Sequence, residues 1–124
     1  MNKLILLFVI LAVAAFAGDF SGTWVGKADL TVDGDPQPLT AKLVLKQDGG
    51  KVTGTAGRED GDEVAPIENA VVDGDALSFD VKPSDDGPVL HVVLTMDGDR
   101  LTGTLKSVGE GPAVEGKLDL KRER

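Results

Sequence analysis

The chain has no cysteine and no tyrosine, and only one tryptophan and one histidine among its 124 residues. Without cysteine no disulfide bond stabilises the fold, so the hydrophobic core must do so. The lack of cysteine also excludes an anchor attached through a lipidated thiol. The single histidine, His91, cannot build a histidine-rich metal site and gives no clear Ser-His-Asp arrangement. We therefore expect no catalytic residues, no metal site and no cofactor.

The first seventeen residues, MNKLILLFVILAVAAFA, have the three parts of a secretory signal peptide. Lys3 is the positive start, residues 4–14 are an apolar run, and Ala15-Phe16-Ala17 is a small-x-small cleavage site. A membrane-spanning helix needs about 20 apolar residues, and no basic cluster follows the run. The sequence predicts a signal peptide over residues 1–17 and one domain over residues 18–124. An uncleaved N-terminal anchor is the alternative.

The cleaved protein is then secreted or periplasmic, with no stable membrane insertion. The 13 basic residues include Lys3, so residues 18–124 contain 12 basic and 21 acidic residues, a net charge of −9. This charge repels nucleic acid and anionic membrane surfaces, and we expect neither as a partner. No feature of the sequence indicates the oligomeric state.

After residue 18 the chain consists of short runs in which apolar and polar residues alternate, separated by Gly, Asp and Pro. A period of two is typical of half-buried β-strands. We expect eight strands, over residues 20–32, 39–47, 51–58, 65–72, 76–82, 89–96, 100–108 and 113–122. Three connections begin with the Asp-Gly pairs at Asp48, Asp73 and Asp97 and are predicted to be tight hairpin turns. The other four are predicted to be longer loops, over residues 33–38, 59–64, 83–88 and 109–112.

The tight turns and longer loops alternate along the chain, which places all the tight turns at one end of an up-and-down meander. Eight antiparallel strands with one apolar face can bury that face by closing into a barrel, which also removes exposed sheet edges. Glycine on the inward side of a strand relieves the sharp coiling of a small barrel. Such glycines occur at Gly22, Gly26, Gly54, Gly103 and Gly116. We therefore predict an all-β, eight-stranded antiparallel up-and-down barrel, with a β-sandwich as the alternative.

Residues 45–55, LKQDGGKVTGT, match residues 94–104, LTMDGDRLTGT, almost position by position. Each segment is predicted to form a strand, an Asp-Gly turn and a second strand. Either an internal duplication or the shared chemistry of hairpins explains the similarity.

Gly22-Thr23-Trp24, near the start of the first expected strand, resembles the Gly-x-Trp motif of the lipocalin and avidin (calycin) superfamily. Members of that superfamily are up-and-down barrels of eight or so strands. Their tryptophan closes the barrel floor and is covered by a basic side chain from the last strand. Arg122 has the inward parity of the last expected strand, so the resemblance implies a structural floor made of Gly22, Trp24 and Arg122. The guanidinium would lie over the indole as a cation–π contact.

The chain also departs from the larger members of this superfamily. It is shorter than most lipocalins, lacks the disulfide that many of them carry, and has one tryptophan where biotin-binding relatives use several. It resembles one of the small bacterial lipocalin-like domains.

The longer loops contain six aspartates that we expect to form an acidic mouth: Asp33, Asp35, Asp60, Asp62, Asp85 and Asp86. Such a mouth would attract cations or cationic ligands. The alternative is that the loops are simply polar. Four Asp-Gly-Asp triplets occur, but they lack the spacing of a dedicated Ca²⁺ loop and are explained by turn chemistry.

An eight-stranded barrel is just wide enough to fill itself with side chains or to hold one small ligand. We expect a non-catalytic binding protein that holds a small apolar or amphipathic ligand in the barrel. The lumen residues expected to contact it are Leu30, Leu43, Phe79, Leu90 and Leu105. The alternative is a filled barrel that acts as a protein-interaction or inhibitor module through its acidic loops.

Overall fold

A computed structural model of the chain describes residues 19–61, 64–85, 87–109 and 111–123. The predicted signal peptide, and Asp62 and Asp86 of the expected acidic mouth, lie outside the described residues.

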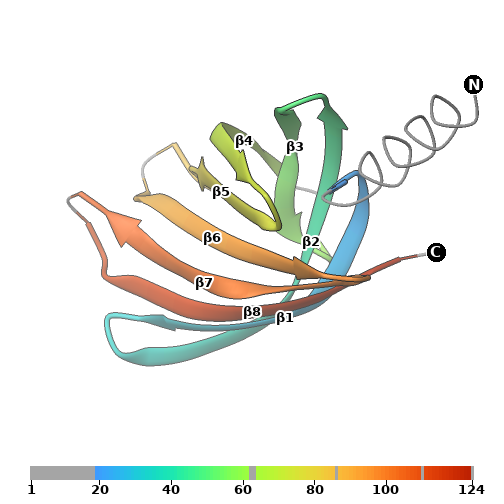
Figure 1. The fold of residues 1–124 in the computed structure, drawn as a ribbon. Helices are drawn as coiled ribbons and strands as arrows, with labels where there is room; N and C mark the ends of the chain where they lie inside the picture. Colours follow the sequence, from blue (N-terminus) through green and yellow to red (C-terminus); the bar gives the residue numbers. More distant parts are fainter. Residues whose placement is uncertain (1–18, 62–63, 86, 110, 124) are drawn as a thin grey trace, which may run out of the picture.

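The described residues form eight antiparallel β-strands that close into a barrel in sequence order (Figure 1). The strands are β1 Gly22–Val32, β2 Asp35–Asp48, β3 Lys51–Arg58, β4 Val64–Asp73, β5 Ala76–Val81, β6 Val89–Asp97, β7 Arg100–Val108 and β8 Val114–Arg122. Because β1 pairs with both β2 and β8, the sheet is continuous around the barrel. The prediction of an up-and-down barrel is confirmed, and the β-sandwich alternative is excluded. The described residues contain no helix long and apolar enough to cross a membrane.

The connections occupy two ends of the barrel. The β1–β2 turn and the β5–β6 and β7–β8 connections lie on one side of Figure 1, opposite the start of β1 and the C-terminus. We call the side with these connections the loop end and the other side the tight-turn end.

The prediction of a longer loop over residues 33–38 is wrong. β1 and β2 stay paired up to Val32 and Asp35, and only Asp33 and Gly34 form the turn. Both turn residues have positive φ, 51° and 88°, as a tight hairpin turn requires. The two prolines at positions 36 and 38 suggested a loop, but β3 pairs with β2 only from Ala41 onward. The other edge of β2 is therefore unpaired at the prolines, and such an edge tolerates a missing N–H.

The two similar segments fold into hairpins with the same register. Gly54 pairs with Leu45 in the first hairpin, and Gly103 pairs with Leu94 in the second. A Cβ atom on Gly54 would lie 1.9 Å from the carbonyl oxygen of Val44, and one on Gly103 would lie 1.9 Å from that of Val93. The neighbouring strands thus approach so closely that no side chain fits at either position.

The tight-turn half of the barrel is filled by large apolar side chains. Those with no exposed surface there are Phe20, Trp24, Leu77, Leu94, Leu101 and Leu120. Toward the loop end the inner face carries several small residues, including Ala28, Ala41 and Ala56. Large residues therefore close one end of the barrel, and small residues leave space toward the other.

Candidate ligand cavity and barrel floor

The floor of the barrel is formed by Trp24 and Arg122. The two residues are directly paired across β1 and β8, so their side chains share the inner face. Trp24 is completely buried, and its Nε1 donates a hydrogen bond to the carbonyl oxygen of Phe20 at 2.9 Å. The guanidinium carbon of Arg122 lies 4.2 Å from the centroid of the indole ring. This is a cation–π contact, in which the guanidinium covers the indole at the tight-turn end of the barrel.

The Arg122 guanidinium also joins three parts of the chain. Its Nη1 and Nη2 donate to the carbonyl oxygens of Ser21 and Asp19, the latter at 3.2 Å. Its Nε donates to a carboxylate oxygen of Asp99, in the β6–β7 turn, at 3.1 Å. One side chain of the last strand therefore holds the segment before β1 and the turn between β6 and β7 against the floor.

Phe20 and Gly22 complete the floor. The backbone N–H of Phe20 donates to Oε1 of Gln47 at 2.8 Å, and the Phe20 ring is completely buried. Gly22 has a φ of 135°, and a Cβ there would lie 3.2 Å from Nη1 of Arg122. Gly22 therefore leaves the guanidinium room to reach the carbonyls before β1. The sequence pointed to Gly22 but gave Phe20 no role in the floor.

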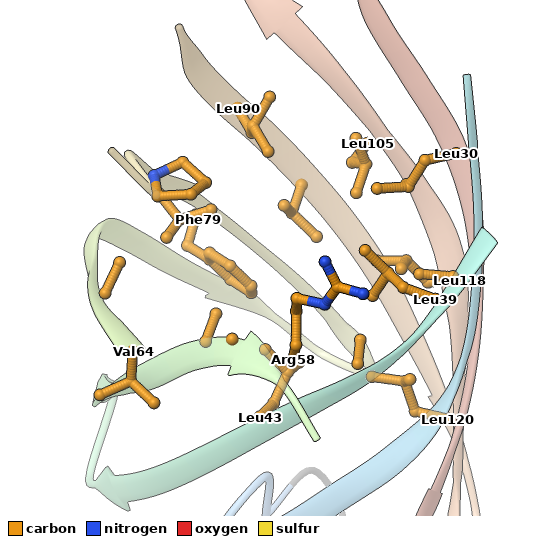
Figure 2. A pocket seen from close by; sticks show the side chains of 18 residues that line it. Leu30, Leu39, Leu43, Arg58, Val64, Phe79, Leu90, Leu105, Leu118 and Leu120 are labelled. Carbon is orange, nitrogen blue, oxygen red and sulfur yellow. The ribbon is translucent and has the colours of Figure 1, made fainter. Parts of the chain in front are cut away.

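Between this floor and the loop end lies a cavity of about 320 Å³ (Figure 2). All five residues that we expected to line the lumen do line it: Leu30, Leu43, Phe79, Leu90 and Leu105. Of the 18 described residues that line it, 17 are apolar or glycine, and the small ones among them leave the space. The volume is at the lower end of the range for small-molecule pockets, about 300–1,000 Å³.

Among the residues that the structure describes, Arg58 is the one charged residue that lines this cavity. It is the last residue of β3 and pairs directly with Ala41 of β2, which also lines the cavity. Cross-strand partners share a face, so the Arg58 side chain starts from the inner wall. Its side chain is 63% exposed, which places it at the mouth, and its Nε lies 3.6 Å from Oδ1 of Asp60. We did not predict Arg58 from the sequence, although it continues the inward alternation that begins at Val52.

The described aspartates of the expected acidic mouth do not line the cavity. Asp33 accepts a hydrogen bond from the backbone N–H of Ala113 at 2.9 Å and so ties the β1–β2 turn to the start of β8. Asp35 is the first residue of β2, Asp60 faces Arg58, and Asp85 is exposed in the β5–β6 connection. The attraction of cations to this end stays a prediction.

His91 lies on the outer wall of the barrel and is exposed, as its parity in the sequence predicted. Its Nδ1 is 2.8 Å from Oδ1 of Asp80 on the neighbouring strand, and Nδ2 of Asn69 donates to Oδ2 of Asp80 at 3.1 Å. The hydrogen bond to His91, followed by that from Asn69, lowers the pKa of Asp80 below its ordinary value. Within the part of the chain that the structure describes, no three His, Cys, Asp or Glu side chains group to hold a metal ion.

No protein-family model, no curated protein and no solved structure matches the chain. We therefore infer a function from the fold and from the side chains that surround the cavity.

Proposed function

We propose that this protein is an exported, non-catalytic binding protein that holds one small apolar or amphipathic ligand inside its barrel. The observation that carries the proposal is the cavity of about 320 Å³ between the filled floor and the loop end. An apolar cavity of about 150 Å³ is already large enough to bind benzene. The space also favours a ligand carrier over the alternative of a filled barrel acting only through its loops.

The apolar lining gives a rough scale for the affinity. Each buried methylene group contributes about 0.8 kcal/mol, so a ligand that buries about six of them gains about 5 kcal/mol. This corresponds to a dissociation constant on the order of 0.1–1 mM for a simple alkyl chain. Tighter binding requires a polar group at the mouth or a ligand shape that fills the cavity better.

The proposal includes membership among the lipocalin-like barrels of the calycin superfamily. It is supported by the closed meander of eight strands and by the Gly-x-Trp motif at the start of β1. It is also supported by Arg122 of the last strand, which covers the indole of Trp24. Export rests on the signal peptide predicted over residues 1–17 and would leave the protein secreted or periplasmic.

A variant that fills the cavity tests the proposal. Ala56→Leu places extra bulk on a residue that lines the cavity, whereas Ala113→Leu makes the same change at an exposed position before β8. We expect the wild-type protein and Ala113→Leu to bind one equivalent of the neutral apolar dye N-phenyl-1-naphthylamine. Ala56→Leu should bind it at least about tenfold more weakly, a loss of about 1.4 kcal/mol.

Thermal unfolding of all three proteins serves as the folding control. Equal dye binding by the two variants, or no binding by the wild-type protein, would show that the cavity is not a ligand site.

A further inference from the structure

We propose that the cavity selects an amphipathic ligand with an anionic head, which Arg58 binds at the mouth while the apolar tail occupies the barrel. This inference rests on the proposed function and specifies the chemical class of its ligand. It also reverses the preference for cations that the acidic loops suggested.

The backbone around Arg58 fixes the position of its side chain at the mouth. Its pairing with Ala41 fixes its Cβ on the inner wall, and the backbone N–H of the next residue, Glu59, donates to the carbonyl oxygen of Thr40 at 2.9 Å. The backbone of β3 is thus fixed to β2 at Arg58 and at the residue that follows it. Figure 2 shows that side chain among the apolar residues that surround the opening.

The wall of the cavity and its mouth offer different environments to a charged group. An ionised head deep among leucines would lose its hydration without a partner, which is strongly unfavourable. At the mouth, the Arg58 side chain remains 63% exposed, so a charged head there keeps part of its water and gains a guanidinium partner. The planar guanidinium offers two parallel N–H donors that match a carboxylate. An anionic head and an apolar tail therefore each find a suitable environment.

The Arg58 guanidinium is available to bind a ligand. Its contact with Asp60 spans 3.6 Å between Nε and Oδ1, which is too long for a good hydrogen bond. Both side chains are largely exposed, at 63% and 81%, so water screens the pair and a ligand displaces it at little cost. Arg100 on the outer wall differs, because its Nε and Nη2 bind both oxygens of Asp119 at 2.8 and 2.6 Å.

Asp60, the described carboxylate that contacts Arg58, is exposed and screened by water, and the other described aspartates of this end oppose an anion only from a distance. Charges in solution are screened over about 8–10 Å at ordinary ionic strength, whereas a bound carboxylate would touch Arg58 directly. Asp33 and Asp35 are part of the β1–β2 hairpin and do not line the cavity. The direct contact with Arg58 therefore decides whether the mouth prefers an anionic or a cationic head.

Three eight-carbon probes with different heads test the inference at pH 7: octanoate, 1-octanol and octylammonium. Their affinities are measured by displacement of the neutral dye from wild-type protein, from Arg58→Gln, and from Arg100→Gln as the matched arginine control. We expect wild-type protein to bind octanoate about fivefold more tightly than octanol, which is the gain expected from one partly exposed charge pair. Octylammonium should bind least tightly. Arg58→Gln should remove the preference for octanoate, and Arg100→Gln should keep it. Raising the salt concentration should reduce the preference in wild-type protein.

Equal binding of octanoate and octanol would overturn the inference while leaving a ligand cavity in place. An unchanged preference in Arg58→Gln, or octylammonium as the tightest probe, would do the same. Failure of the dye and of all three probes to bind would instead overturn the proposed function, and the inference with it.

Discussion

Replacing Gly103 by alanine should weaken the barrel strongly, although alanine adds only one methyl group. That methyl carbon would lie 1.9 Å from the carbonyl oxygen of Val93 and 2.9 Å from Cα of Leu94. Side-chain Cβ atoms essentially never approach other atoms closer than 3.0 Å, so β6 and β7 would have to separate by about 1.1 Å. The atoms in the way belong to the backbone of β6, which cannot rotate aside as a flexible side chain would.

The cost follows from what that separation disturbs. Forcing an extra methyl group into a packed interior costs about 1–3 kcal/mol. Stretching the hydrogen bonds between the two strands adds about 1 kcal/mol for each bond lost. We expect Gly103→Ala to lower the free energy of unfolding by about 3 kcal/mol. For a domain of this size, the midpoint temperature of thermal unfolding should fall by about 12 °C. Gly54→Ala, at the equivalent position of the other hairpin, should cost at least as much, because Gly54 also has a φ of 155°.

Urea unfolding followed by the fluorescence of Trp24 measures this difference, because the chain has only this tryptophan and it is completely buried. Gly50→Ala is the matched control, since a Cβ at this turn position would meet nothing within 4 Å. It should change the free energy of unfolding by less than about 0.5 kcal/mol. If Gly103→Ala were as stable as Gly50→Ala, our explanation of the two glycines would be refuted.

Two further substitutions test the floor and the outer wall. Arg122→Met keeps an apolar stem over Trp24 but loses the cation–π contact and the bonds to the carbonyls before β1. It should cost about 2 kcal/mol and shift the Trp24 emission to longer wavelength, and an unchanged spectrum and stability would contradict the role of Arg122. Because the pKa of Asp80 is lower in the folded protein, its contact with His91 stabilises the fold at pH values above the ordinary carboxyl pKa of about 3.9. This stabilisation is lost as the pH falls through the lower pKa of the folded state. Asp80→Asn should therefore be less stable than wild type by about 0.5 kcal/mol at pH 7, and this deficit should shrink as the pH falls below the ordinary carboxyl pKa. A deficit that does not change with pH would show that the charge is not responsible.

Much of the fold could be predicted because one physical pattern specifies it. Alternation of apolar and polar residues identified all eight strands, and the Asp-Gly turns fixed three hairpins. The wrong loop at residues 33–38 shows the limit of this reasoning. Pro36 and Pro38 exclude a strand only where both edges are paired, and the sequence does not reveal that β2 extends beyond β3.

The cavity was only partly predictable from the sequence. Parity along each strand was enough to place Leu30, Leu90 and the other expected lumen residues on the inner wall. Arg58 was missed because a charged residue next to an acidic loop is normally assigned to that loop, and only its register with Ala41 places it at the mouth. The volume itself depends on how side chains from non-adjacent strands meet across the barrel. The alternation of residues along one strand holds no information about the distance between side chains on opposite walls of the barrel.

In the proposed function, the cavity between the floor and the loop end holds a small ligand. Native mass spectrometry of the protein purified from its own host tests this most directly, because it records the protein and any bound molecule together. We predict a stoichiometric adduct that is released on denaturation and is a small amphipathic molecule with an acidic head. A bare protein mass, together with no uptake of neutral apolar dye, would contradict the account.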